Sequence, residues 1–448
     1  MPALPPDVDD ILTRLVREGD SKRLATVLGQ NRSEESQTKY LHWDKLRYKQ
    51  PPAELTADEW WLRIKWGRRA IAREVELLLS KAGRPLWYCL PDLVLESVDN
   101  ISRRASGDIV ISEQVTNAQT RDTYIVSSLI EEAITSSQLE GAVTSRRVAK
   151  DMIRSGRTPT DRSERMILNN YNAMRRVSEL RKTDMTPELV CEIHRIVTEN
   201  TLDDPSAAGR LQAVDEDRVA IWSVNDDELL HQPPPASELP DRLRRLCEFA
   251  NGGGRYMPPV LRAIATHFMF GYDHYFEDGN GRTARALFYW SMLRQGYWLA
   301  EFITISRILK NAPAKYTRSF LLTETDEGDL TYFFIYQLGV IERAITELHV
   351  YLAKKAQELR EAQDRIRALP GEFNYRQLAL LEHAIKNPNA MGYSAKSHAR
   401  SHNVTTETAR TDLAALERRG YLVQRKIGRR FIWLPAPDLP SLLPTPAA

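Results

Sequence analysis

Cysteine is scarce in this chain of 448 residues, and the three that occur are Cys89, Cys191 and Cys247. They are far apart and odd in number, so they form neither a metal-binding spacing nor a disulfide framework. The chain also lacks an apolar run of about 18 residues and a basic-then-apolar N-terminal signal. From these absences we expect a cytoplasmic protein without a membrane partner.

An excess of charge of one sign is absent as well, since 62 Lys and Arg residues stand against 60 Asp and Glu residues. This balance excludes a global electrostatic affinity for nucleic acid. No Gly-x-x-x-x-Gly-Lys-Ser/Thr motif occurs, which excludes the P-loop mechanism of nucleotide hydrolysis. The length of the chain predicts two or three domains.

The most informative stretch is residues 274–285, which read His-Tyr-Phe-Glu-Asp-Gly-Asn-Gly-Arg-Thr-Ala-Arg. It follows one apolar helical pattern and opens another, so we expect a helix N-terminus with free N–H groups at its glycines. His274, with an ordinary pKa of about 6.5, is a candidate general base. Asp278 is an oxygen ligand of the kind that Mg²⁺ prefers.

The other polar residues of this stretch suit a bound phosphate. Gly279 and Gly281 allow close approach of the backbone to an anion, and Asn280 tolerates a left-handed conformation, so the three predict an anion-binding nest. Arg282 and Arg285 lie three apart on one helical face, where bidentate phosphate contacts are available. The alternative is a glycine-rich helix cap, but a cap needs no histidine, aspartate and arginine pair at fixed offsets.

Residues 274–285 are similar to the signature of Fic-domain proteins, His-x-Phe-x-Asp/Glu-Gly-Asn-Gly-Arg-x-x-Arg, and the similarity extends over roughly residues 40–345. It implies transfer of AMP from ATP to a Ser, Thr or Tyr hydroxyl of a protein, with His274 as base and Asp278 holding Mg²⁺. It also implies that the Gly279–Gly281 backbone holds the α- and β-phosphates, and that Arg282 binds phosphate oxygens and Arg285 the γ-phosphate. Some Fic relatives use another phosphate donor, and the motif leaves this open.

Residues 136–141 read Ser-Ser-Gln-Leu-Glu-Gly and close a helical pattern over roughly residues 123–140. Ser136 and Glu140 are four apart and share a helical face. An ordinary surface glutamate is one interpretation. The sequence also resembles the inhibitory motif of Fic proteins, Ser/Thr-x-x-x-Glu-Gly/Asn, which implies that Glu140 pairs with Arg285. In some relatives this glutamate supports removal of AMP, so a brake and a reverse catalyst both remain open.

A β-like piece over residues 218–224 and the turn after it predict a two-stranded hairpin. In Fic proteins such a hairpin is a flap that aligns the target by strand pairing. Trp222 is either a flap contact or a core residue. We assign Tyr316 to the adenine side of the site, with a core tyrosine as the alternative, and interpret His194 and His267 as buried, hydrogen-bonded histidines.

Residues 371–436 resemble a winged helix-turn-helix domain, because three helical patterns are followed by two alternating strands. Between Met391 and Leu434, nine Lys and Arg residues stand against three Asp and Glu residues. Thr406 and Arg410 lie early on the recognition-helix candidate, and Arg429 and Arg430 lie on the wing. Duplex DNA is therefore an expected partner, with a protein-interaction module as the alternative.

We therefore expect a mainly α fold: an N-terminal helical region over residues 1–110, a Fic domain over 111–365 and a winged helix-turn-helix over 371–436. The Fic helical core should carry a short β-hairpin flap and an inhibitory helix near 123–141. Within the first region, the tryptophans should pack on the core, and residues 59–79 carry a helical pattern. The expected partners are ATP and a protein hydroxyl, including one on the chain itself. The sequence leaves open a homodimer and a nucleotide-sensing, DNA-binding regulator.

Overall fold

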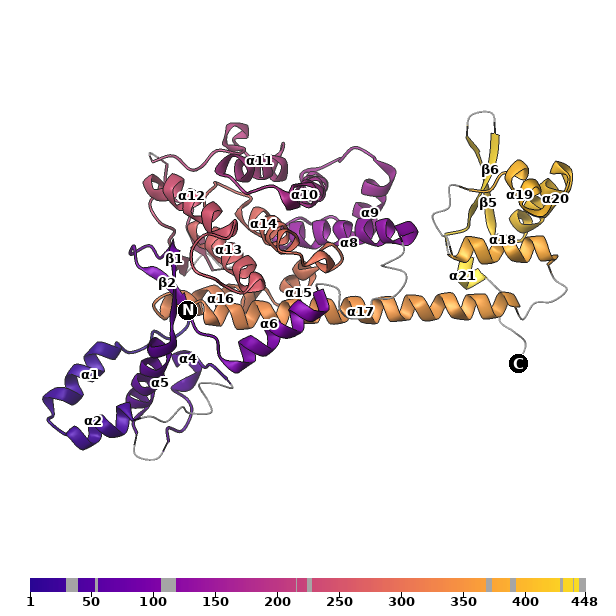
Figure 1. Cartoon of the computed structure of the whole chain (residues 1–448). Coiled ribbons are helices and arrows are strands. Elements are labelled where there is room, and N and C mark those ends of the chain that lie inside the picture. Colours follow the sequence, from indigo (N-terminus) through magenta and orange to yellow (C-terminus); the bar gives the residue numbers. More distant parts are fainter. Residues whose placement is uncertain are drawn as a thin grey trace. The chain divides into compact units, whose positions relative to one another are not determined.

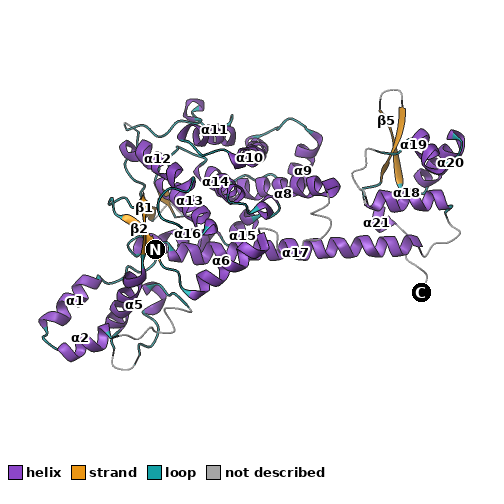
Figure 2. Ribbon diagram, viewed as in Figure 1, coloured by secondary structure: helices purple, strands orange, loops and turns teal. Residues whose placement is uncertain are grey.

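The computed structural model describes residues 1–29, 39–52, 55–105, 118–214, 216–223, 228–367, 373–386, 392–427, 430–437 and 439–442. This part of the chain is mainly helical and contains three two-stranded antiparallel sheets (Figures 1 and 2), which confirms the predicted fold class. The chain forms two compact units, one of residues 1–109 with 128–345 and one of residues 110–127 with 346–448. None of the helices in the described ranges has the length and apolar character that crossing a membrane demands.

The N-terminal part of the first unit is built on a small aromatic core. Its elements are α1 (Val8–Arg17), α2 (Ser21–Leu28), α4 (Trp43–Leu46), α5 (Ala57–Ile71), β1 (Arg73–Leu79), β2 (Pro85–Tyr88) and α6 (Asp92–Ala105). A capping box of Thr56 and Glu59 begins α5. Trp60 and Trp61 are buried with apolar residues of α1 and α2, so these tryptophans serve packing.

The helix predicted over residues 59–79 is wrong in its second half. Helix α5 ends at Ile71, and residues 73–79 form strand β1, which pairs antiparallel with β2. The turn between the strands includes Gly83 at a φ of 75°. The strand is stabilised by its partner, Pro85–Tyr88, and local apolar periodicity contains no signal for that pairing.

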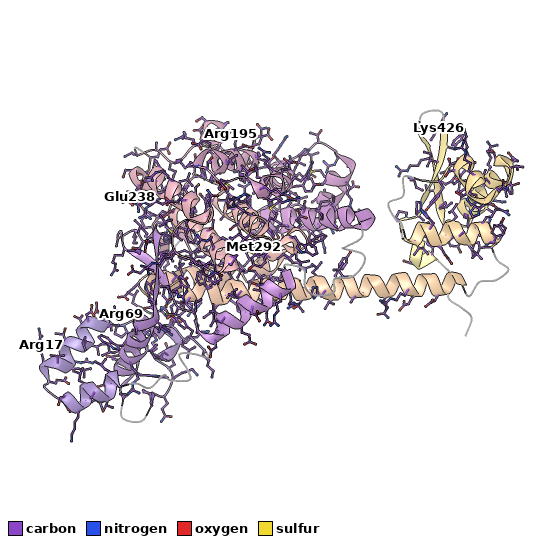
Figure 3. The ribbon with its side chains drawn as sticks, in the orientation of Figure 1. Arg17, Arg69, Arg195, Glu238, Met292 and Lys426 are labelled. Carbon is purple, nitrogen blue, oxygen red and sulfur yellow. The ribbon has the colours of Figure 1, made fainter. Side chains whose placement is uncertain are left out.

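The rest of the first unit is a helical bundle. Its helices are α8 (Ala118–Leu139), α9 (Arg146–Ser155), α10 (Arg162–Glu179), α11 (Pro187–Thr198), α12 (Leu239–Ala250), α13 (Pro259–Asp273), α14 (Asn280–Arg294), α15 (Ile305–Asn311), α16 (Pro313–Thr325) and α17 (Thr331–Arg367). The part of α8 before residue 128 and the part of α17 after residue 345 belong to the second unit. Helices α13 and α14 are buried along most of their length and pack on each other, and α14 also packs on α10 and α11. Met292 of α14 lies among densely packed side chains, whereas Arg195 lies at the periphery (Figure 3).

A buried ionic network joins α5 to the segment between α16 and α17. Lys65 Nζ lies 2.7 Å from Asp326 Oδ1, and both side chains are almost fully buried. Arg68 donates to the hydroxyl of Tyr332, which in turn donates to Asp326. The hydroxyl of Tyr40 donates to Asp329 at 2.7 Å. The two buried cations and two buried carboxylates balance one another, as buried charges require.

The predicted hairpin is present but short. It pairs β3 (Ile221–Trp222) with β4 (Leu229–His231), and residues 224–227 between them lie outside the described part of the chain. Trp222 is 50% exposed, so it is not a core residue. Of the two interpretations of Trp222, the one that remains is a contact residue of the flap.

The second unit has its own apolar core. Its elements after α17 are α18 (Tyr375–Lys386), α19 (Ala395–His402), α20 (Thr406–Arg418), β5 (Leu422–Ile427), β6 (Arg430–Pro435) and α21 (Leu439–Leu442). Ser394 caps α19, Thr405 caps α20, and the strands pair antiparallel. Three helices and a hairpin follow in the predicted order. Arg429 and the side chain of Arg430 lie outside what the structure describes.

Candidate functional site

His274 caps the C-terminus of α13 in a left-handed conformation. Its φ is 51°, and its backbone N–H donates to the carbonyl of Phe270 at 3.2 Å. A left-handed conformation costs a non-glycine residue about 1–3 kcal/mol, so the surrounding structure must hold it in place. The turn that follows joins α13 to α14 and contains the whole 274–279 segment.

The His274 ring is half-buried, and its Nδ1 atom is buried without a partner of good hydrogen-bond geometry. Burial lowers the pKa of His274 to about 4, and the nearby His231 and Arg218 lower it further, while the Gly271 carbonyl and Glu140 oppose the fall. The imidazole is therefore neutral at physiological pH. A neutral imidazole can accept a proton from a hydroxyl.

Asn280 closes the turn on itself. Its side chain accepts from the backbone N–H of Phe276 at 3.0 Å and donates to the carbonyl of Phe276 at 2.7 Å. Gly279 precedes it as the N-cap of α14, at a φ of 82° and without a side-chain cap. The start of α14 thus presents backbone N–H groups of the kind that bind anions.

His194 of α11 fixes the other side of the turn. Its Nδ1 accepts from the backbone N–H of Gly209 at 2.9 Å, so its Nε2 carries the proton and donates to the carbonyl of Asp278 at 2.8 Å. Its ring stacks on Phe276 with centroids 3.7 Å apart. The sequence predicts a buried, hydrogen-bonded histidine here. Its contact with the turn is new, because nothing local in the sequence indicates it.

The two glycines of the turn are required by their neighbours. A Cβ at Gly279 would lie 2.7 Å from Thr198 Cγ2, and a Cβ at Gly281 would overlap the carboxylate of Glu140. The Glu140 carboxylate therefore rests against the first turn of α14, where an anion is favoured by the helix dipole.

Arg282 and Asp278 form a pair beside this helix terminus. Arg282 is fully buried, donates to the carbonyl of Val197 at 3.2 Å and reaches Asp278 Oδ2 at 3.3 Å, while its Nε is buried without a partner. The Asp278 side chain is 45% exposed. Over the described ranges, no group of three His, Cys, Asp or Glu residues could hold a metal ion. One half-exposed carboxylate fits Mg²⁺ that takes its remaining ligands from phosphate and water.

Arg285 is held by the segment that ends α8. Its Nε donates to Ser136 Oγ at 2.8 Å, and its Nη2 donates to the Ser136 carbonyl at 3.0 Å and to Glu140 Oε1 at 2.8 Å. The Arg285 side chain is buried, and that of Glu140 is 29% exposed. The two residues that the sequence singles out as partners of this arginine, Ser136 and Glu140, are thus in direct contact with it.

Tyr316 of α16 lies near Arg285 and interacts with its charge. Its hydroxyl is 2.8 Å from Nε2 of the fully buried His267. Burial raises the pKa of Tyr316. The Arg285 guanidinium lowers this pKa, and the Glu140 carboxylate raises it. The ring is half-buried, and its contact with adenine stays a prediction. Of the residues assigned to DNA, Thr406 and Arg410 are exposed on α20, where Arg410 pairs with Glu407 at 3.0 Å.

Behind the turn lies a second layer of polar residues that sequence reasoning missed. Asp273 is fully buried, accepts from Tyr275 at 2.6 Å and pairs with Arg242 at 3.1 Å. Burial raises the pKa of Asp273 to about 6, against the effect of Arg242. His231 of β4 lies 2.7 Å both from Glu324 and from the carbonyl of Tyr272.

Comparison with known proteins finds a similarity in the central segment. Residues 184–292 match the model of the Fic/DOC family. A Fic family protein from Desulfovibrio desulfuricans G20 is similar in structure, with a TM-score of 0.50 and 17% identity over 77% of this chain and 97% of that one. Fic-1 from C. elegans gives a TM-score of 0.48 and 17% identity over 76% of this chain and 86% of that one. No curated protein sequence matches the chain.

Proposed function

We propose that this chain, whose residues 184–292 match the Fic/DOC family, transfers AMP from ATP to a Ser, Thr or Tyr hydroxyl of a protein and is restrained by Glu140. One observation carries the proposal. The turn that begins at the neutral His274 leads into the uncapped N-terminus of α14, whose buried Arg282 and Arg285 pair with Asp278 and Glu140. The site thus joins a base to an anion-binding cradle.

In the reaction, His274 accepts the proton of the target hydroxyl as the hydroxyl oxygen attacks the α-phosphorus. The bond between that phosphorus and the oxygen leading to the β-phosphate breaks, and pyrophosphate leaves. The turn at Gly279–Gly281 and the Arg282 guanidinium would hold phosphate oxygens through backbone N–H groups and charge-assisted bonds. Mg²⁺, for which Asp278 is the ligand that the chain offers, supplies positive charge against the phosphates.

Restraint by Glu140 follows from its position. Its carboxylate contacts both Arg285 and the first turn of α14, which are two groups that a nucleotide phosphate needs. A charged hydrogen-bonded pair of this kind contributes about 1.5–3 kcal/mol, so its removal should raise transfer about ten- to hundredfold.

The test measures incorporation of α-labelled ATP, with Mg²⁺, by wild type, Glu140→Gly, and Glu140→Gly combined with His274→Ala. We expect strong labelling of Glu140→Gly and not of wild type or of the double variant. Glu131→Ala is a matched control, because Glu131 lies on α8 but pairs with Arg146 and Lys150 instead of Arg285. Intact-mass analysis of the single variant alone would detect self-modification.

The same experiment separates the neighbouring reactions. Binding of ATP without transfer in any variant would contradict the proposal and favour another phosphate donor or a nucleotide sensor. Loss of AMP from labelled protein that depends on Glu140 would instead assign that residue to AMP removal. A gain of labelling in the Glu131→Ala control would show that loosening α8, and not freeing Arg285, activates the site.

A second candidate function is binding of duplex DNA by residues 371–436, which we assign to the winged helix-turn-helix class. The exposed Thr406 and Arg410 in the first half of α20 support it, since this end of a recognition helix meets base edges. Binding that falls steeply with salt and weakens in Arg410→Ala is the expected result. No binding at low salt would favour a protein-interaction module. For the whole chain we propose a cytoplasmic location, in keeping with its three free thiols.

A further inference from the structure

The backbone of the catalytic turn is held by one side chain from the base of the flap. Arg218 lies three residues before β3, and its Nη2 donates to the carbonyl of Asp273 at 2.7 Å and to that of His274 at 3.0 Å. These two carbonyls end α13. The last carbonyls of a helix have no partner within it, so a guanidinium placed here supplies what the helix cannot.

The remaining donors of Arg218 tie the turn to both ends of the flap. Its Nε donates to the carbonyl of Pro234 at 2.7 Å, three residues after β4, and its Nη1 donates to the side chain of Gln212. The backbone N–H of Gln212 in turn donates to the carbonyl of Tyr275 at 3.0 Å. Three successive carbonyls of the turn are therefore held by the segment that leads into the flap.

Arg218 also places its charge close to the base. Within the described residues, its four hydrogen bonds go to neutral oxygens, and Asp273 acts on the guanidinium at longer range. The groups that set the charge of His274 are Arg218 and His231, which favour the neutral ring, and Glu140 and the Gly271 carbonyl, which oppose them.

From these contacts we infer that Arg218 is a positioning residue for AMP transfer. It holds His274 in its left-handed conformation and couples the β3–β4 flap to the orientation of the base. A target segment that moves the flap therefore acts on His274 through one side chain. The inference rests on the proposed function, because it presumes that His274 is the base.

The test uses the active Glu140→Gly chain as parent and adds Arg218→Gln or Arg218→Lys. Misplacing a catalytic group by about 1 Å lowers a rate by up to about a hundredfold, so we expect kcat of Arg218→Gln to fall about ten- to hundredfold. The Kd for ATP should stay within about twofold, because Arg218 contacts the turn from the side of the flap and not from α14. Arg218→Lys keeps the charge and should recover part of the rate.

The pH profile distinguishes positioning of the base from a general structural role. Arg218 lowers the pKa of His274, which is about 4 in the intact site. Removing the positive charge raises this pKa, so the acidic limb of the rate should move to higher pH in Arg218→Gln and return in Arg218→Lys. Arg210→Gln is the matched control, since Arg210 lies in the same loop and pairs with Glu216.

The outcomes are separable. No transfer by the Glu140→Gly parent would overturn the proposed function itself. Transfer by the parent that is equally fast in Arg218→Gln would overturn the role of Arg218 alone. Equal losses of rate and ATP affinity, with an unmoved acidic limb in both Arg218 variants, would reduce Arg218 to a structural residue. If Arg218→Gln does not fold, the kcat of Arg218→Lys and the acidic limb of its pH–rate profile are compared with the parent by the same criteria.

Discussion

His194 has its protonation state set by two backbone groups. The Gly209 N–H donates to Nδ1, and the Asp278 carbonyl accepts from Nε2, so a second proton on the ring would break the first bond. Burial lowers the pKa of His194 from 6.5 to about 4. Between these two values the unfolded chain binds a proton that the folded chain does not, so acid favours unfolding.

We therefore expect His194→Gln to lose less stability than wild type when the pH falls. Glutamine keeps one acceptor and one donor but does not titrate. Wild type should lose about 1.4 kcal/mol more per pH unit below about pH 6.5. Urea unfolding of both proteins between about pH 7.5 and 5 measures this difference. Parallel curves would show that His194 does not titrate as its contacts require.

Single residues of the site differ in how readily the sequence reveals them. The site residues within 274–285 are neighbours in sequence, so their chemistry can be interpreted from one short stretch. His194 and Arg218 act on the same turn from 84 and 55 residues away. Their roles depend on backbone carbonyls, which every residue has, so no residue type in the turn indicates which distant side chain will meet it.

At the scale of elements, α8 and α14 meet through Glu140 and Gly281. A methyl group at Gly281 would overlap the Glu140 carboxylate, which must then leave Arg285. We expect Gly281→Ala to cost wild type about 1–3 kcal/mol. In the Glu140→Gly background the overlap with the carboxylate is gone, and the remaining 3.2 Å approach to Arg285 Nη1 is relieved by a small shift of that side chain. Alanine also favours the helix, so the cost should vanish or reverse. Chemical unfolding of wild type, the two single variants and the double variant gives the coupling energy between the two positions. Equal costs of Gly281→Ala in both backgrounds would contradict the predicted overlap.

Elements could be predicted where their stabilisation is local. Asp161, Thr186, Ser394 and Thr405 cap their helices through their own side chains, and the order of helices and strands after residue 373 follows the sequence pattern. Strand β1 could not be predicted in this way, because Arg73–Leu79 depends on pairing with β2. The flap hairpin, by contrast, could be predicted from the β-like piece over residues 218–224 and the turn after it, although its strands are short.

For the whole molecule, the buried charges between α5 and the α16–α17 segment predict strong coupling. Removing one partner of a buried ion pair costs about 3–5 kcal/mol, so Lys65→Met should destabilise the first unit by this amount. Arg69→Met is the control on the same helix, because the Arg69 pairs with Asp9 and Glu327 are exposed and are worth about 0–1 kcal/mol. Denaturant unfolding compares them. Similar losses in the two variants would show that the buried network is not a source of stability.

This network also limits how the protein can be shortened. Lys65 and Arg68 lie before residue 110, while their partners Asp326 and Asp329 lie beyond the 274–285 turn. A fragment that began after residue 110 would keep the two carboxylates in an interior from which both cations had been removed. A fragment of residues 111–365, the predicted Fic domain, should therefore be insoluble or unfolded, and a minimal active piece has to include Tyr40 as well as Lys65 and Arg68.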